Sequence, residues 1–239
     1  MKYFTKEWYR DSLASDICFQ LNSSSKAAKF SEKHFSSLYS AQEKWSVKQS
    51  KRFSRSEFSV EKAREEFKKN YEENLAFVKN ALPDEILNSV ADVRLLALGV
   101  ADGNTVQAIA RHCGKLARKC EKAQNDYDER LEALAEEIGW LKINTLNLII
   151  GAPIACALRD GDKFVIETSA DNTDIACRLE LLGAEIASET GVIDATVLQT
   201  EILREGERLE LNLLCEKVDG SLCEFSAALD SFEVEEITH

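Results

Sequence analysis

The stretch Ile138-Gly-Trp-Leu-Lys-Ile-Asn-Thr-Leu-Asn-Leu-Ile-Ile-Gly151 separates two kinds of hydrophobic pattern. Before it, apolar residues recur at the spacing of an amphipathic helix. After it, apolar and polar residues alternate, as in β-strands that have one buried face. The sequence therefore predicts an α+β fold in two parts: a helical bundle over residues 1–145 and an antiparallel, sandwich-like β domain over residues 146–239.

Five helices are expected in the first part, at about residues 5–21, 30–45, 60–82, 84–98 and 104–138. Ser59 precedes the third helix as an N-cap, and Pro83 ends it. The fourth helix is short and apolar on most sides, which predicts a buried helix that ends at Gly99. Asn104 is the expected N-cap of the fifth helix. The basic, serine-rich residues 48–59 predict a frayed helix end or a loop.

The second part predicts five or six antiparallel strands. Its clearest feature is a hairpin in which the two-residue turn Asp219-Gly220 joins residues 209–215 to Leu222–Leu229, because both turn residues accept a positive φ. The apolar alternation then slips by one position before Phe232. A β-bulge at Asp230-Ser231 would keep both apolar sets on the core face.

Negative charge is concentrated in the β part. Residues 1–150 contain 24 Lys and Arg against 22 Asp and Glu, whereas residues 151–239 contain 6 against 20. The second part therefore carries a formal charge of −14 and the first part +2. Such a field repels nucleic acids and anionic membrane surfaces, and it attracts a basic protein.

The cysteines and the first residues bear on the compartment. The seven cysteines are widely spaced and form no CxxC pair, so we expect reduced thiols in the core of a cytoplasmic protein. The chain begins without an apolar signal segment, and its longest weakly polar run is too short to span a bilayer. The cysteines are Cys18, Cys113, Cys120, Cys156, Cys177, Cys215 and Cys223.

The motifs predict no catalytic residue, no cofactor and no metal site. His112 and Cys113 are adjacent on a helix and project about 100° apart, so they do not converge on a metal ion with Cys120. Ser59-Val-Glu-Lys62 matches SxxK, but its serine is already explained as a helix cap. The chain also lacks a P-loop and a GxSxG elbow.

Two carboxylate pairs, Asp160/Asp162 and Asp171/Asp174, leave weak calcium binding open as an alternative. The Asp-Gly-Asp sequence of the first pair is typical of a turn, which is the simpler interpretation.

One resemblance rests on the opening nonapeptide Met1-Lys-Tyr-Phe-Thr-Lys-Glu-Trp-Tyr9, and more weakly on residues 82–87 and 91–99. With these segments the chain resembles a family of small Firmicute proteins known as domain of unknown function 4085. The similarity runs through most of the chain, including residues 209–237. It implies a bacterial protein, and it supplies no activity, cofactor or catalytic residue.

Two functions compete. The first is a non-enzymatic cytoplasmic interaction module, of the adaptor or immunity type, that binds a basic protein through the acidic β part or through the aromatic residues Tyr3, Phe4, Trp8 and Tyr9. In a simpler interpretation, Phe4 and Trp8 merely pack the first helix onto the bundle. The alternative function is a hydrolase or small-molecule-binding protein with a carboxylate-lined cleft between the two parts.

Overall fold

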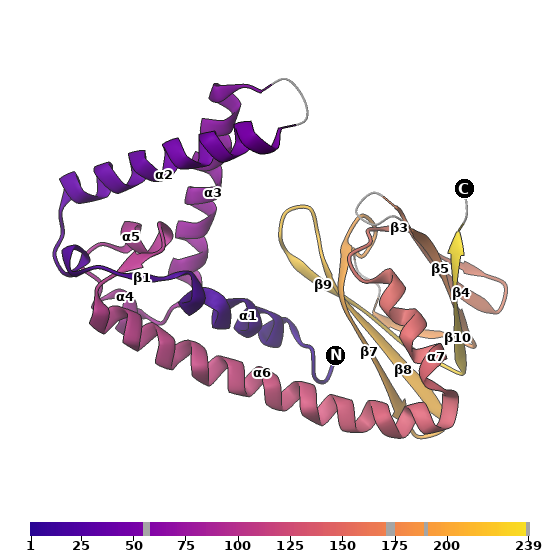
Figure 1. The fold of residues 1–239 in the computed structure, drawn as a ribbon. Coiled ribbons are helices and arrows are strands. Elements are labelled where there is room, and N and C mark those ends of the chain that lie inside the picture. The colour runs from indigo at the N-terminus through magenta and orange to yellow at the C-terminus, as the bar shows by residue number, and fades with distance from the viewer. Residues whose placement is uncertain (55–57, 171–174, 189–190, 238–239) are drawn as a thin grey trace. The chain divides into compact units, whose positions relative to one another are not determined.

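The computed structural model describes residues 1–54, 58–170, 175–188 and 191–237, except for the side chains of residues 19 and 20. The chain forms two compact units. Residues 10–119 form the helical unit, and residues 1–9 together with residues 120–239 form the barrel unit. This division does not follow the expected border at residue 145. It falls inside two helices, α1 (Lys6–Ser15) and α6 (Gly103–Ile138), so the first nine residues belong with the strands (Figure 1).

Helices precede the strands along the chain, as the sequence predicted, and the α+β class is confirmed. The helical unit contains part of α1, the 3-10 helices Asp16–Gln20 and Ser25–Ala28, and the first part of α6. A short parallel pair, β1 (Asn22–Ser23) and β2 (Val100–Ala101), joins distant segments of this unit. Its other helices are α2 (Glu32–Phe53), α3 (Val60–Ala81), α4 (Asp84–Leu87) and α5 (Val93–Ala97).

The helix ends agree with the sequence in part. The Ser59 side chain accepts a hydrogen bond from the Lys62 N–H, which confirms it as the N-cap of α3. Gly99 has a φ of 70°, the left-handed conformation expected after a helix. Residues 48–53 do not form a loop, because α2 continues to Phe53.

Two expectations about helices were wrong. The segment 84–98 forms α4 and α5 instead of one helix, because the Asp92 carboxylate accepts a hydrogen bond from the Arg94 N–H and starts a new helix there. Asn104 does not cap α6. Asp102 does so by accepting the N–H groups of Asn104 and Thr105, at 2.9 and 3.3 Å.

Eight strands follow residue 150 in the described part of the chain, more than the five or six expected. The difference arises because one predicted strand is interrupted at Gly183, which has a φ of 63°, and another is divided at Asp230. The strands are β3 (Ile154–Asp160), β4 (Lys163–Thr168), β5 (Ala176–Leu182), β6 (Glu185–Ser188), β7 (Thr196–Glu205), β8 (Arg208–Glu216), β9 (Leu222–Leu229) and β10 (Ser231–Ile237).

The strands form two antiparallel sheets that together make a partly open barrel. The first sheet has the order β10-β5-β4-β3 and the second β6-β9-β8-β7. β5 leads into β6 and β9 into β10, which joins the sheets on one side. On the other side, residues 151–154 pair with residues 194–197 just before β3 and at the start of β7. The core between the sheets contains the stacked rings of Phe164 and Phe225, 5.6 Å apart.

Helical residues complete this core. The end of α6 contributes Leu134, the helix α7 (Trp140–Thr145) contributes Ile143, and the 3-10 helix Leu146–Ile149 contributes Ile149, which is fully buried. Gly139, with a φ of 89°, ends α6 and lets the chain turn into α7.

The predicted hairpin is present, but the predicted bulge at Asp230-Ser231 is not. Ser231 pairs with Leu182 and Ala228 with Glu185, so each strand has two residues between these pairs and neither has an extra one. β8 and β9 are joined at Asp219-Gly220, but Lys217 and Ser221 close a longer loop, so the expected two-residue turn was wrong. The loop therefore contains three residues, 218–220, and its last residue, Gly220, has a φ of 78°. This combination is typical of three-residue hairpin loops. The Asp230 N–H donates to Leu182 O where β9 gives way to β10, and the buried face changes at this point in both paired strands.

The barrel is built from two similar meanders. Leu158-Arg-Asp-Gly-Asp-Lys-Phe-Val-Ile-Glu167 spans the β3–β4 turn, and Leu203-Arg-Glu-Gly-Glu-Arg-Leu-Glu-Leu-Asn212 spans the β7–β8 turn. Gly161 and Gly206 open the two turns with φ values of 63° and 64°. The third strand of each meander is divided in two, and these strands pair antiparallel along their length. We infer an internal duplication with approximate two-fold symmetry.

Candidate functional site

The aromatic residues expected to bind a partner lie against the barrel unit of their own chain. Phe4 is fully buried, and its ring centre lies 4.7 Å from that of Tyr127 and 4.8 Å from that of Trp8. Trp8 is half-buried and donates its indole N–H to Cys120 O at 3.3 Å. Tyr3 and Tyr9 are also half-buried. Phe4 therefore has no free surface for a partner, whereas the other three rings have some.

A buried carboxylate holds this N-terminal segment in place. Glu201 of β7 has no exposed surface and accepts the backbone N–H groups of Lys2, Tyr3 and Phe4 at 2.7, 2.7 and 3.1 Å. Asn212 of β8 donates its side-chain amide to the same carboxylate at 3.3 Å. These hydrogen bonds compensate the desolvation of the charge. The role of Glu201 is therefore structural, although a buried carboxylate is otherwise a candidate for catalysis.

The outer surface of the first sheet is more accessible. Residues that alternate with the core positions of its four strands point away from the barrel. Leu158 is the most exposed apolar side chain among them, at 47%, whereas Val165 at the centre of the surface is buried. We call this surface the open face; it consists of Cys156, Leu158, Asp160, Lys163, Val165, Glu167, Arg178, Glu180, Leu182, Ser231, Glu233 and Glu235.

Ion pairs cross the middle of the open face. Glu180 contacts Lys163 at 2.6 Å and Arg178 at 2.9 Å, and these two cations lower the pKa of its carboxyl group. Arg178 also contacts Glu167 at 2.8 Å and Asp160 at 3.9 Å. Two cations thus face three carboxylates at the centre of this surface, which leaves an excess of negative charge.

β10 adds carboxylates at one margin of the open face. Glu233 and Glu235 belong to the face, whereas Glu236, opposite Cys177, projects from the other side of the strand; all three are exposed. None of the three forms an ion pair with a residue that the structure describes. Unpaired, exposed carboxylates at the edge of a sheet are what a basic partner would recognise. We therefore take the open face, together with β10, as the candidate binding site.

A pocket of about 450 Å³ in the barrel unit contains two further carboxylates. Glu205 contacts Lys2 at 2.7 Å, and this ammonium lowers the pKa of the Glu205 carboxyl group. Glu137 forms an ion pair with Arg204. Each carboxylate is already engaged with a cation, so neither is placed as a free general base.

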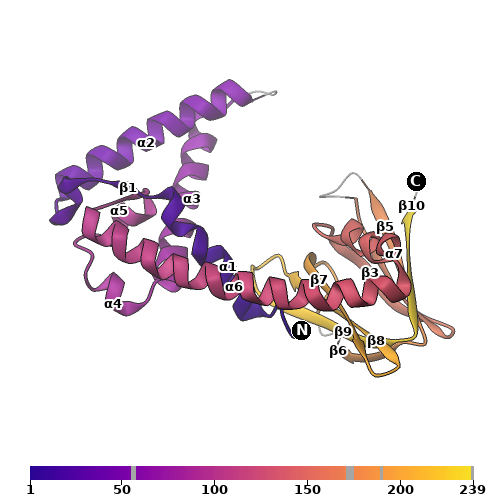
Figure 2. The same ribbon diagram turned by 60° about the horizontal axis from the view of Figure 1, so that its bottom comes forward.

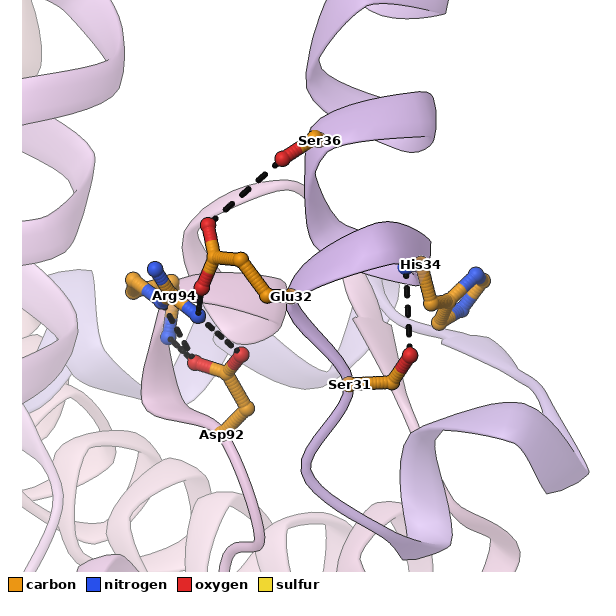
Figure 3. Close-up of polar contacts among 6 residues, drawn as sticks. All are labelled: Ser31, Glu32, His34, Ser36, Asp92 and Arg94. Atoms are coloured by element: carbon orange, nitrogen blue, oxygen red, sulfur yellow. Dashed lines mark hydrogen bonds and ion pairs between the residues drawn. The ribbon is translucent and has the colours of Figure 1, made fainter.

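The helical unit has a charged cluster of its own, centred on Arg94 of α5 (Figure 3). Arg94 contacts Asp92 at 2.9 Å and Glu32 of α2 at 2.8 Å, and it lowers the pKa of the Asp92 carboxyl group. Its guanidinium carbon lies 4.1 Å from the ring centre of Phe35 and 5.3 Å from that of Phe30. Two carboxylates neutralise this cation, so the cluster ties α5 to the start of α2.

The residues considered for metal binding lie as follows. The Cys113 thiol is buried and donates to Ala14 O at 3.4 Å, and burial raises its pKa to about 11. Asp160 and Asp162 flank the β3–β4 turn, whereas residues 171 and 174 lie outside the described part of the chain. No three His, Cys, Asp or Glu side chains among the described residues lie close enough together to hold a metal ion.

No model of a protein family matches this chain, and no curated protein or solved structure is significantly similar to it. Within the described residues, no helix is both long enough and apolar enough to cross a membrane.

Proposed function

We propose that this protein is a non-enzymatic cytoplasmic interaction module, of the adaptor or immunity type, whose barrel unit binds a basic protein. The observation that carries the proposal is the open face, where a network of ion pairs with too few cations adjoins three unpaired carboxylates on β10. Leu158 provides an apolar contact within it. Binding surfaces commonly combine an apolar anchor with charges that select the partner.

Charge distribution supports the same assignment. The barrel unit has 11 Lys and Arg against 28 Asp and Glu, a formal charge of −17, whereas the helical unit has 19 against 14, or +5. A field of this size accelerates the approach of a basic protein and weakens as salt is added. We therefore expect fast, salt-sensitive association at the barrel unit.

The N-terminal aromatic residues have a supporting part in this proposal. Phe4 and the hydrogen bonds of Glu201 anchor the segment to β7, which keeps that region of the barrel unit intact. Tyr3, Trp8 and Tyr9 could still contribute their exposed edges to a partner, but their main contacts are with their own chain.

Affinity capture from the native host with charge-reversal variants tests the proposal. We expect the full-length protein to capture a basic protein at low salt, and Glu233→Lys/Glu235→Lys to lose it. Glu129→Lys/Glu132→Lys, which changes two exposed residues of α6 in the same unit by the same charge, should retain it. The proposal would be contradicted if both double variants captured the basic protein equally well, or if the wild type captured only acidic proteins.

A further inference from the structure

β10 is the edge strand of the first sheet (Figure 2), and among the described residues it has a neighbouring strand on one side only. It pairs with β5 from Ser231 to Ile237 without a shift of register. Near its start, α7 contacts it through Lys142, whose ammonium donates to the Ser231 hydroxyl at 2.7 Å. Beyond that contact, residues 233–237 are exposed or half-buried. This second part of β10 is an accessible sheet edge.

The backbone groups that face the free edge follow from the pairing. The N–H and C=O of Cys177 both bond to the Thr168 hydroxyl, so they point from β5 toward β4 and away from β10. Glu236 lies opposite Cys177, so this is a pair without mutual hydrogen bonds. The N–H and C=O of Glu236 therefore point to the free edge, and by alternation so do those of Val234.

We propose that a basic segment of the partner binds as an added strand along this edge, hydrogen-bonded to the backbones of Val234 and Glu236. The inference rests on the proposed function and specifies how the partner is held. Main-chain hydrogen bonds supply affinity in this mode, and alternate side chains supply specificity. Lys or Arg at every second position of the added strand would lie beside Glu233 and Glu235 on the open face.

The charge of the edge selects this occupant over a second copy of the chain. If two β10 strands paired with each other, the carboxylates of Glu233, Glu235 and Glu236 would lie close to those of the second copy, and like charges on paired strands repel. Edge charges of this kind commonly protect a sheet from self-association. A basic strand removes the repulsion and turns the same residues into ion-pair partners.

Two peptide probes separate strand addition from simple charge attraction. The first is an eight-residue peptide with alternating Lys and Val; the second is the same peptide with N-methyl groups on all of its backbone amides. Both have the same charge, but the second cannot form the ladder. We expect the first to bind the full-length protein about tenfold or more tightly than the second, since at least two hydrogen bonds are lost. Equal binding of the two, or no binding of the first, would overturn strand addition.

A variant and an exchange measurement locate the edge. Glu236→Pro removes an edge-facing N–H that bonds to no neighbouring strand, so the sheet tolerates it and the first peptide should bind several-fold more weakly. In the wild type, the peptide should slow amide hydrogen exchange at Val234 and Glu236. Unchanged exchange there would contradict the proposal even if Glu236→Pro failed to fold. If Glu233→Lys/Glu235→Lys lost the captured partner and Glu236→Pro kept it, the proposed function would stand and strand addition would be wrong.

Discussion

At the scale of single residues, Glu201 has the greatest consequence for the barrel unit. Its carboxylate is removed from water and stabilised by the N–H groups of residues 2–4 and by Asn212. Two of its partners lie 197 and 199 positions away in sequence. No periodicity or motif indicates such a contact, so the sequence shows Glu201 only as one of several polar residues in a strand.

Glu201→Ala should destabilise the protein by about 2–5 kcal/mol, because it leaves three backbone N–H groups without a hydrogen-bond acceptor. Glu201→Gln keeps one carbonyl oxygen as an acceptor and should lose less of the free energy of unfolding. Chemical denaturation at neutral pH measures both. Glu205→Ala is the control: its pair with Lys2 is solvent-exposed, so its loss should change stability little. A similar small loss for Glu201→Ala would show that the anchor contributes little.

Tyr127 makes stability depend on pH in the alkaline range. Its hydroxyl accepts the Ile202 N–H at 3.1 Å, and burial raises its pKa to about 12, above the ordinary value of 10.0. Because ionisation is easier in the unfolded chain, the stability linked to Tyr127 is complete below about pH 10 and is lost as pH rises toward 12.

Tyr127→Phe should therefore lose about 1–2 kcal/mol at neutral pH, through the unpaired Ile202 N–H. Its stability should also fall less steeply than that of the wild type between pH 10 and 12. Unfolding followed at several pH values measures both effects. Cys113 and Cys215 are present in both proteins, so their raised pKa values affect the pH dependence of stability equally in the wild type and in the variant. Parallel curves would contradict the assignment.

At the scale of elements, turn glycines fix the hairpins of the barrel. A side chain at Gly220 would meet no atom within 4 Å, so only its φ of 78° opposes substitution. Gly220→Val should destabilise by about 1–2 kcal/mol. Gly114→Ala, inside α6, is the matched control and should leave stability unchanged or raise it by up to about 1 kcal/mol. Thermal unfolding measures the melting temperatures of both variants. An unchanged melting temperature for Gly220→Val would mean that the loop relaxes to accept the side chain.

Element types were predictable where periodicity was strong. The alternation through β8 and β9 and the cap at Ser59 identified elements that the structure confirms. The break before α5 escaped prediction because the Asp92 carboxylate starts a helix inside a segment whose apolar residues fit one helix. The sequence Leu158-Arg-Asp-Gly161 returns in similar form as Leu203-Arg-Glu-Gly206. This similarity was visible in the sequence, and it would have indicated two similar meanders and the number of their strands.

At the scale of the molecule, the two units differ in charge more than the two halves of the sequence do. The first nine residues and the end of α6 belong to the barrel unit, which raises its formal charge to −17 against −14 for residues 151–239. Hydrophobic spacing reports local structure and does not show which distant segments share a core, so the sequence placed the border at residue 145. The candidate site was foreseen as acidic; its location on the open face required the strand pairing.

The central claim is that the carboxylates of β10 select a partner by charge, and a charge swap tests it most directly. Binding to full-length protein would be measured for the alternating Lys-Val peptide and for its Glu-Val counterpart. The wild type should prefer the Lys peptide, and Glu233→Lys/Glu235→Lys should reverse that preference, each by about tenfold at low salt and less at high salt. If the double variant kept the preference of the wild type, the site would lie elsewhere.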